Sequence, residues 1–241
     1  MPLHTTIIRQ ENVSSSDREA MFSLQLRHYD GVAAGAFACA LADKDWVIQL
    51  RDSDGKIVGF STQKLFRIPA AGRERSFLFS GDTIVSPEHW MESTLAGAFG
   101  HLMKRVWEET AYDCHWFLIT KGFRTYRFLP VFFKHFIPWH GQTAAEWELA
   151  DLLKAVAQAR FGKDYDPCSG LITPAGGDRL CPELAAIPES RRRDPHVSYF
   201  VARNPRYAQG VELACLASID PDNLNRAGRR VIDRARVEWR E

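Results

Sequence analysis

The side chains best suited to chemistry lie close together in the stretch "SGDTIVSPEHW", residues 80–90. Asp82 interrupts an apolar strand pattern, and a charged group at such a place is costly unless it is paired. A carboxylate there can take a proton from a reacting group. His89 lies in the turn that follows, where an imidazole can accept a proton near neutral pH. Asp82 and His89 are therefore candidates for proton transfer; the alternatives are a structural hydrogen bond for Asp82 and a helix cap for His89.

The same stretch reads as a strand, a turn at Ser86-Pro87 and an amphipathic helix, which is an arrangement that can hold a phosphate. The helix N-terminus offers free N–H groups and a partial positive charge, and the hydroxyls of Ser93 and Thr94 add polar groups. The turn contains no glycine, so Cβ atoms crowd the approach to the backbone, and Glu92 repels an anion. The pattern predicts a weaker anion site than a glycine-rich turn would form.

Hydrophobic spacing and turn residues predict the elements that position this stretch. In chain order we expect a helix within 14–31, a packed helix or loop at 31–42, a hairpin over 45–66, a loop at 67–75, a strand at 76–85, a helix that reaches 107, a buried strand at 114–120, a helix at 121–136 that Pro130 kinks or splits, a helix at 144–161, strands at 196–204 and 211–219, and a helix at 221–240. This order predicts an α/β fold with a mostly antiparallel sheet, one parallel crossover and flanking helices. We expect one domain over 1–241, with an irregular insertion at 162–195.

The composition is that of an ordinary globular protein, with 241 residues, 45% hydrophobic residues and a formal net charge of +1. A charge so near zero gives no global field that favours nucleic acid or a membrane surface. The five cysteines form no C-x-x-C pair, the histidines show no metal-ligand spacing, and we find neither a signal-peptide pattern nor an apolar run of about 18 residues. We expect a cytoplasmic protein with reduced thiols, no membrane span, no nucleic-acid partner and no metal site.

Two segments resemble the GNAT (GCN5-related N-acetyltransferase) superfamily. "DTIVSPEHW" (82–90) is similar to the strand that enters the acyl-carrier-binding turn, often V-x-P-x-x-R-G-x-G, and "WFLITKGFRTYRFLPVFFKHF" (116–136) is similar to the following strand and helix. The segment "KGFRTYRFLP" (121–130) also resembles a bacterial subgroup of GNAT-like N-acyltransferases, some of which transfer long chains. The resemblance covers about residues 15–140 and implies a GNAT-like fold.

The resemblance implies an enzyme that moves an acyl group from a pantetheine thioester to a primary amine. The backbone of Thr83, Ile84 and Val85 would bind the amides of the pantetheine arm. Asp82 would take the amine proton, and Tyr126 would protonate the departing thiolate. The alternative for Tyr126 is an ordinary core tyrosine with its hydroxyl at the surface. No permanently bound cofactor is implied, because acyl-CoA or acyl-phosphopantetheine is the donor substrate.

The chain departs from the family pattern at the turn itself. Aligned on Pro87, the phosphate-binding positions read from Trp90 to Leu95, without a glycine and without the initial basic residue. The donor-binding candidates in and beyond the turn are Trp90, Ser93, Thr94, Lys121 and Arg124. Two donors stay open: a CoA whose pyrophosphate is held by side chains such as Lys121 and Arg124, or an acyl-carrier protein, whose arm ends in a single phosphodiester.

Two further features bear on the donor. An aromatic segment predicts core packing, part of which would line an acyl-chain tunnel; its members are Phe123, Phe128, Phe132, Phe133, Phe136 and Trp139. The arginines of 221–240 and of "RRRD" at 191–194 predict a solvated face, or a docking surface for an acidic carrier protein.

The sequence leads to an N-acyltransferase for a medium or long acyl chain. Its acceptor would be a small amine or a lysine-type side chain of a peptide, and the second case would be a lipidation. Two alternatives stay open. One is a catalytically inactive GNAT-shaped module that binds an acyl group, CoA or a protein, and the other is a nucleic-acid-binding protein.

Overall fold

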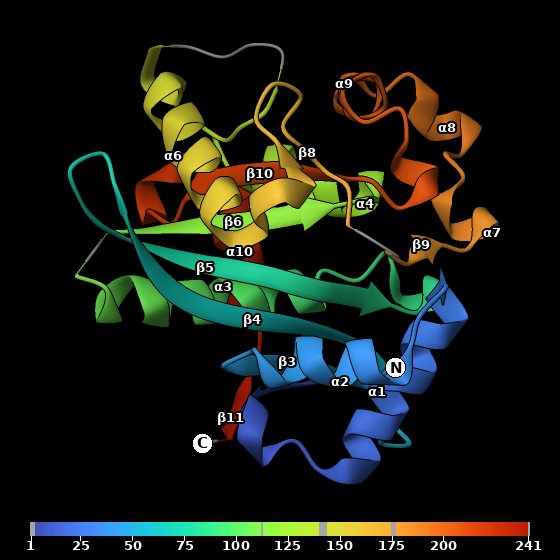
Figure 1. Ribbon diagram of the computed structural model, residues 1–241. Helices are drawn as coiled ribbons and strands as arrows, with labels where there is room; N and C mark the ends of the chain where they lie inside the picture. Colours follow the sequence, from blue (N-terminus) through green and yellow to red (C-terminus); the bar gives the residue numbers. More distant parts are fainter. Residues whose placement is uncertain (1–2, 112, 140–143, 175–176, 241) are drawn as a thin grey trace.

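The structure is a computed structural model that describes residues 3–111, 113–139, 144–174 and 177–240. These residues form an α/β fold around a nine-stranded sheet in the order β11-β1-β3-β4-β5-β6-β10-β8-β7 (Figure 1). The strands are β1 (His4–Arg9), β3 (Trp46–Arg51), β4 (Ile57–Ala70), β5 (Arg73–Val85), β6 (Cys114–Thr120), β7 (Tyr165–Asp166), β8 (Leu171–Ile172), β10 (Glu212–Ser218) and β11 (Glu238–Arg240). The β5–β6 and β1–β11 pairs are parallel and the other pairs of this sheet are antiparallel, which confirms the expected fold class.

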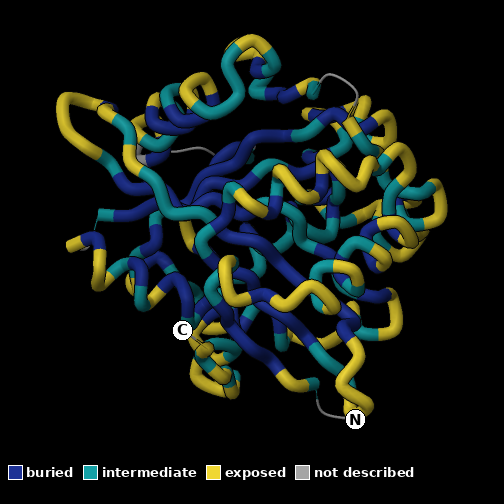
Figure 2. Tube along the Cα trace, turned by 60° about the horizontal axis from the view of Figure 1, so that its bottom comes forward, coloured by how far each residue is buried: buried dark blue, intermediate teal, exposed yellow. Residues whose placement is uncertain are grey.

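Helices cover both faces of the sheet. They are α1 (Ser15–His28), α2 (Ala34–Ala42), α3 (Thr94–Glu109), α4 (Phe123–Tyr126), α5 (Phe128–Phe132), α6 (Ala144–Phe161), α7 (Pro182–Ala185), α8 (Glu189–Arg192), α9 (Pro195–Arg203) and α10 (Arg226–Arg234). One face packs into a large hydrophobic core with α3, α4, α5 and α9, and α10 lies against α3 and α5. The other face carries two separate cores, one under α1 and α2 and one under α6. Figure 2 shows the strands as a largely buried interior and the exposed residues on outer helices and turns.

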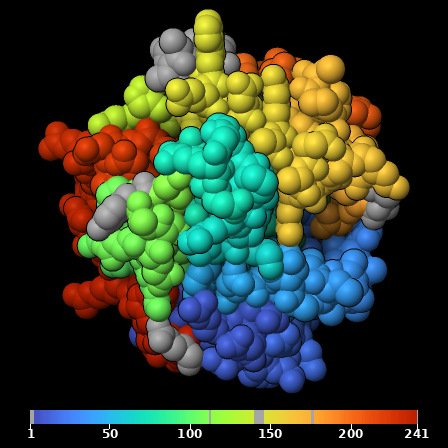
Figure 3. Space-filling view, turned by 60° about the vertical axis from the view of Figure 1, so that its left-hand side comes forward, coloured from blue at the N-terminus to red at the C-terminus, as the bar shows by residue number. Residues whose placement is uncertain are grey.

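The predicted helix within 14–31, the hairpin over 45–66 and the buried parallel strand at 114–120 are confirmed as α1, β3–β4 and β6. The predicted loop at 67–75 is wrong, because β4 and β5 pair from Ala70↔Arg73 onward and leave only two residues for the turn. Phe66, Ile68 and Ala70 pack against the core under α6, and this burial favours an extended strand. In Figure 3 this long hairpin (teal) lies between α3 (green) and the α6 region (yellow).

Three other elements differ from the prediction. Residues 196–204 lie mostly in helix α9, not in a strand: Asp194 caps the N–H groups of His196 and Val197, and Val197 and Phe200 face the core at helical spacing. The last helix ends at Arg234, and β11 follows it. Strand β1, with which β11 pairs, was not predicted.

The segment 121–136 is divided into two short helices, as predicted, but the division falls at Arg127, and Pro130 lies within α5. Pro130 is the third residue of that helix, where a proline lacks no helical hydrogen bond. Residues 162–195, expected to be irregular, contain β7, β8, β9 (Arg179–Leu180), α7 and α8 among loops. A single domain over 1–241 stays a prediction.

Within the described ranges, no helix has the length and hydropathy that a membrane crossing needs.

Candidate active site

The site begins where the parallel strands β5 and β6 separate. Their described pairing runs from Ser76↔Cys114 to Ser80↔Leu118, after which β5 continues to Val85. A bulge in the β4–β5 register lies at the same place, because Gln63 pairs with Ser80 but Ser61 pairs with Thr83. Gly81 and Asp82 therefore oppose one residue of β4, and the local twist of β5 increases. We call the place beyond Ser80 and Leu118, where the described parts of β5 and β6 no longer pair, the opening.

Gly81 allows the bulge to pack closely. A Cβ atom at this position would lie 2.6 Å from Thr62 Oγ1 and 2.7 Å from Lys44 Cε. Any side chain at Gly81 would therefore displace Lys44 or the neighbouring strand. Asp82 lies on the α1 side of the sheet, because its Oδ1 is 3.5 Å from Nε2 of Gln25, a residue of α1. Ser80 and Thr83 line the cavity on the opposite face.

A chain of buried hydrogen bonds fixes the edge of the opening. The hydroxyls of Ser61 and Thr83 are 2.8 Å apart, and Gln63 Nε2 donates to Ser61 Oγ at 2.7 Å. Ser80 Oγ donates to Gln63 Oε1 at 2.8 Å and accepts from Trp116 Nε1 at 2.8 Å. Satisfied buried networks of this kind hold side chains in one arrangement. This network connects β4, β5 and β6.

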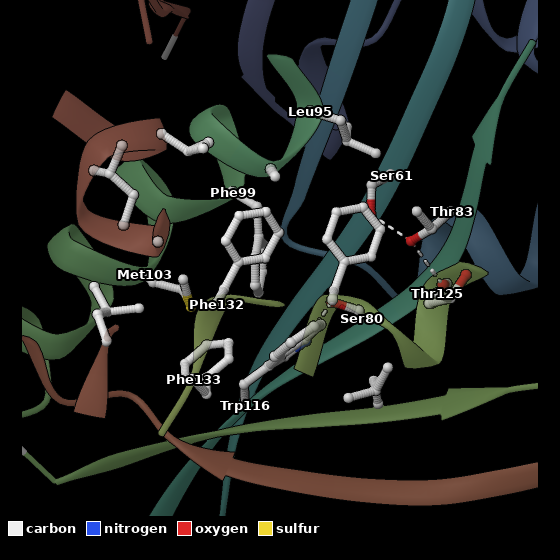
Figure 4. A pocket seen from close by; sticks show the side chains of 18 of the residues that line it. Ser61, Ser80, Thr83, Leu95, Phe99, Met103, Trp116, Thr125, Phe132 and Phe133 are labelled. Atoms are coloured by element: carbon white, nitrogen blue, oxygen red, sulfur yellow. Dashed lines mark hydrogen bonds between the residues drawn. The ribbon is translucent and has the colours of Figure 1, made fainter. Parts of the chain in front are cut away.

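An apolar cavity lies on the α3 face of the opening (Figure 4). Its apolar walls come from β6, α3, α4–α5 and the C-terminal segment, and they include Leu95, Ala96, Phe99, Met103, Trp116, Leu118, Ile119, Phe128, Phe132, Phe133, Leu224, Val231 and Ile232. Ser61, Thr83 and Thr125 gather at one end of the cavity, and Met103 lies at the other (Figure 4). Of the aromatic segment, Phe128, Phe132 and Phe133 are among the cavity residues.

Helix α10 closes this cavity because it packs very close to α3. A Cβ atom at Gly100 of α3 would lie 2.1 Å from Ile232 Cγ1. The same helix α10 presents Val231 and Ile232 to the cavity, while Arg226 and Arg230 are exposed on its outer side. One amphipathic helix thus combines an apolar wall with a basic outer surface.

A cluster of polar and charged side chains lies on the other face, between the core under α1–α2 and the core under α6. We call it the carboxylate cluster; its members are Gln25, Tyr29, Lys44, Asp82, Lys121, Asp178 and Glu212. Gln25 Nε2 lies 3.5 Å from both Asp82 Oδ1 and Asp178 Oδ2. Lys121 Nζ lies 2.5 Å from Asp178 Oδ1 and 3.4 Å from Glu212 Oε1. The cluster brings together helix α1, strands β5 and β10, and the segment before β9.

The charges of the carboxylate cluster are poorly solvated. Burial raises the pKa of Asp82, the ammonium of Lys44 opposes the shift, and the carboxylate of Asp178 adds to it. Burial also raises the pKa of Glu212, against the opposing effect of Lys121. The pKa of Lys121 is raised: burial lowers it, but the carboxylates of Glu212 and Asp178 outweigh burial. Asp82 and Glu212 are therefore stronger bases than ordinary surface carboxylates.

Local backbone structure places Tyr29 and Asp178 in the cluster. Tyr29 belongs to β2 (Tyr29–Asp30), which pairs with β9 in the register Tyr29↔Leu180. Gly210, at a φ of 89°, lets the chain of Asp178 approach closely, since a Cβ atom there would lie 2.6 Å from Asp178 O. Lys121 Nζ also donates to that carbonyl oxygen at 3.1 Å. The insertion thus contributes a carboxylate to the site.

The turn after β5 is partly filled by its own side chains. Trp90 Nε1 donates to Val85 O at 2.7 Å, and the Arg124 guanidinium lies 3.8 Å from the centroid of the Trp90 ring. Arg124 also donates to Leu184 O at 2.7 Å. His89 Nδ1 lies 2.8 Å from Glu92 Oε1, and no contact recorded among the described residues joins it to the carboxylate cluster. Trp90 and Arg124 thus bridge the space between the turn and α4.

The remaining donor-binding candidates have simpler positions. Ser93 is the N-cap residue of α3 without a side-chain cap, and Thr94 is the first residue of that helix. The first turn of α3 contains no acidic residue, so the N–H groups there keep their attraction for an anion. Ile84 is buried in the core under α1 and α2, and its backbone pairs with Phe60. The backbone of Thr83 pairs with Ser61.

Two candidates make contacts that do not support the roles predicted for them. Tyr126 is fully buried, and its hydroxyl donates to Pro138 O at 2.7 Å, while burial raises its pKa. This contact indicates a core position, and no recorded contact brings the hydroxyl to the opening. Lys121 is buried between Asp178 and Glu212, so its charge is already neutralised and unsuited to hold a phosphate. Both roles stay predictions without a supporting contact among the described residues.

The sequence analysis did not single out Gln25, Tyr29, Asp178 or Glu212. Glu212 had a readable signal, since it is an acidic residue at the start of the apolar strand "VELACLASI". The other three come from separate parts of the chain, and only the tertiary fold brings them together. Among the described residues, no group of three or more histidine, cysteine or acidic side chains is arranged to hold a metal ion.

No protein-family model and no curated protein matches the sequence. Solved structures with a similar arrangement include a probable N-acyltransferase of unknown function from Enterococcus faecalis V583, with 12% identity, a TM-score of 0.44 and coverage of 56% of this chain and 33% of that chain. Another is the ribosomal-protein-S18-alanine N-acetyltransferase of Escherichia coli, with 15% identity, a TM-score of 0.35 and coverage of 48% and 66%. A third is the GNAT family N-acetyltransferase YhbS of Escherichia coli in complex with CoA, with 10% identity, a TM-score of 0.37 and coverage of 50% and 65%.

The chain thus spans a third of the length of the Enterococcus structure and about two thirds of the other two. The similarity concerns the arrangement of helices and strands alone.

Proposed function

We propose that this chain is a GNAT-like N-acyltransferase that moves an acyl group from a pantetheine thioester to a primary amine. One observation carries the proposal. At the point where β5 and β6 separate, an apolar cavity lies on one face of the sheet and a carboxylate cluster lies on the other. A thioester in this opening would have its acyl chain in the cavity and its carbonyl carbon exposed to the side of Asp82.

Asp82 is suited to act as the general base. Amines are mostly protonated at neutral pH, so the acceptor must lose a proton before it attacks. The raised pKa of Asp82 makes it a better proton acceptor than an exposed carboxylate. The amine nitrogen then forms a bond to the thioester carbonyl carbon and the C–S bond breaks. Asp82 keeps one proton of the ammonium, and the second proton that the nitrogen loses passes through solvent to the leaving thiolate.

The cavity favours a medium or long acyl chain over an acetyl group. An acetyl group needs no cavity beyond the opening, whereas the apolar wall here extends from Leu118 past Phe99 to Met103 and Ile232. Each methylene group of a chain that enters such a wall adds about 0.8 kcal/mol of transfer free energy. The aromatic residues Phe128, Phe132 and Phe133 contribute to the same wall.

The donor arm would lie along β5, beside Thr83, Ile84 and Val85. The carbonyl of Val85 already accepts from Trp90, so the indole occupies one of its two lone pairs and competes with an arm amide for this oxygen. Ser93 and Thr94 at the α3 N-terminus would face the phosphate of the arm. Without glycines in the turn, the single phosphodiester of an acyl-carrier protein fits more easily than a CoA pyrophosphate. The exposed arginines of α10 would face an acidic carrier protein.

A panel of thioesters tests the proposal. The purified protein is mixed with acetyl-, octanoyl- and palmitoyl-CoA and with free and acylated carrier protein, and unfolding temperatures are measured. A ligand at about a hundred times its dissociation constant adds about 2.7 kcal/mol to the free energy of unfolding. We expect stabilisation that increases with chain length, and amide products by mass spectrometry when primary amines are added.

Two other results would change the assignment. Stabilisation by thioesters without any amide product from a broad set of amines and lysine peptides would indicate the inactive binding module. The absence of stabilisation by every thioester would contradict the transferase.

A further inference from the structure

We propose that the carboxylate cluster is the acceptor site and that it binds a primary ammonium group in its protonated form, with Gln25, Asp178 and Glu212 as binding residues beside Asp82. This inference rests on the proposed function, because it identifies the acceptor that the transfer would use. It assigns the residues that select the acceptor and the chemical group that they recognise.

The charge of the cluster favours a cation. Three carboxylates, those of Asp82, Asp178 and Glu212, are matched by two ammonium groups, those of Lys44 and Lys121. Lys44 is also shared with Asp43, which lies 3.7 Å away outside the cluster. The side chains of Glu212 and Asp178 are only 13% and 23% exposed. An excess of negative charge with little access to water is stabilised by a bound cation.

A buried polar atom without a partner points to a ligand that donates hydrogen bonds. Gln25 is 4% exposed, and its Oε1 has no hydrogen-bond partner among the described residues. The same amide group lies 3.5 Å from both Asp82 and Asp178 through Nε2, so it is directed into the cluster. A buried carbonyl without a hydrogen-bond partner destabilises the folded protein. An N–H donor from a ligand would satisfy it.

The two observations together select one chemical group. A primary ammonium carries the positive charge and three N–H donors, enough for Gln25 Oε1 and two carboxylate oxygens. A quaternary ammonium has the charge without the donors, and an alcohol has one donor without the charge. The site lies beside Asp82, so the bound ammonium can pass one proton to that carboxylate and become the neutral amine that attacks.

Two half-buried residues border the site. Tyr29 and Asp178 lie at the paired segments β2 and β9, and both are half-buried. The Lys121 ammonium lies 5.4 Å from the centroid of the Tyr29 ring and holds Asp178 and Glu212 in place. An acceptor would therefore enter past the edge formed by residues 29 and 178. This route lies opposite the cavity that we assign to the acyl chain.

The test measures binding without turnover. The full chain is labelled with nitrogen-15, and NMR titrations at pH 7 compare n-butylamine, butyltrimethylammonium and 1-butanol. The variants are Glu212→Gln and Gln25→Leu, with Glu109→Gln as the matched control, since Glu109 is an exposed acid on α3 paired with Arg105. Folding of each variant is checked from its spectrum, and binding of palmitoyl-CoA and of acylated carrier protein is measured in parallel.

We expect n-butylamine to bind the native protein about tenfold or more tightly than the other two probes, with shifts near residues 25, 82, 178 and 212. Glu212→Gln and Gln25→Leu should each weaken amine binding by about tenfold without changing thioester binding, and Glu109→Gln should change neither. Equal binding of the three probes, or amine binding unaffected by both variants, would overturn the inference even if thioesters bind. Selective amine binding without thioester binding or transfer would support the site and contradict the transferase.

Discussion

The two faces of the sheet differ sharply at the place where β5 and β6 separate. On the α3 face, buried hydroxyls and amides are fully paired with one another around an apolar cavity. On the other face, the carboxylates of Asp82 and Glu212 are desolvated, and Gln25 Oε1 has no hydrogen-bond partner in the described part of the chain. The polar groups of the network on the α3 face already have hydrogen-bond partners, so the cavity beside them is suited to an apolar group. The second face holds desolvated carboxylates, which a ligand that donates hydrogen bonds would stabilise.

In the proposed transfer, this difference would keep the two reactants apart until they meet beside Asp82. An apolar wall excludes an ammonium group, because an unpaired charge there is very costly. A cluster with excess negative charge gives an acyl chain no advantage. The bulge at Gly81 and Asp82 directs neighbouring residues of one strand to opposite faces, so both environments end at the same point.

The largest effect is expected when Asp82, the proposed base, is replaced. Asp82→Asn should lower the rate of acyl transfer by about 10²–10⁴-fold, because the amide cannot accept the amine proton. Binding of the thioester to the opposite face should be unchanged. Transfer is measured by mass spectrometry under saturating donor, with Glu109→Gln as the control. Transfer by Asp82→Asn at the native rate would remove Asp82 from the chemistry.

The α3 face can be altered separately by filling the cavity. Ala96 lines it and is half-buried, so Ala96→Phe should shorten the longest acyl chain that is accepted. We expect the ratio of palmitoyl to octanoyl transfer to fall by about tenfold or more. Ala227→Phe, at an exposed position on the outer side of α10, serves as the control. If transfer fell by the same factor for every chain length, the cavity would not hold the acyl chain.

The fold class could be predicted from the sequence because it rests on local patterns. The apolar alternation before Asp82, the Asp-Gly turn at residues 54–55 and the apolar run at 114–120 each predict their element correctly. Helix α9 was misread as a strand, since Val197 and Phe200 also satisfy a short apolar run when the Asp194 cap is ignored.

Most members of the carboxylate cluster could not be predicted from local sequence patterns. Gln25 and Asp178 look like ordinary polar residues of a helix and a loop, and only the tertiary fold brings them together, with the β2–β9 pairing and the approach at Gly210 placing Asp178. Lys121 was expected at a phosphate for a similar reason. Its position directly after β6 was read correctly, but the carboxylates that neutralise it come from distant parts of the chain.

A smaller effect should appear at the entrance to the donor side. Trp90→Phe removes the donor to Val85 O but keeps a ring under Arg124. The freed carbonyl can then bind the pantetheine arm, and affinity for the thioester should rise by about 2–10-fold, the value of one net hydrogen bond. Isothermal titration with the thioester measures the change. Trp147→Phe, at an exposed position on α6, is the control, and weaker donor binding by Trp90→Phe would mean that the indole itself contacts the donor.

The smallest effect concerns the free energy of unfolding, to which the desolvated carboxylate of Asp82 contributes unfavourably at neutral pH. The pKa of Asp82 is raised in the folded protein, so the folded state retains its proton to higher pH than the unfolded state does. Its contribution is therefore most favourable below the unfolded value of 3.8 and is lost as the pH rises through the folded value. Asp82→Asn should raise the Tm by about 2–4 °C at pH 8, corresponding to ~1 kcal/mol, and the gain should disappear near pH 4. A Tm that falls at pH 8 would show that Asp82 stabilises the fold.

The central claim is that donor and acceptor occupy opposite faces of the sheet and meet beside Asp82. The most direct measurement is a crystal structure of the protein with a thioether analogue of a palmitoyl-pantetheine donor, soaked with n-butylamine. The account predicts the acyl chain between Phe99 and Phe132, the sulfur next to the last β5–β6 pair, and the amine within hydrogen-bond distance of Asp82 and Gln25. An acyl chain on the side of the carboxylate cluster, or an amine bound on the α3 face, would contradict it.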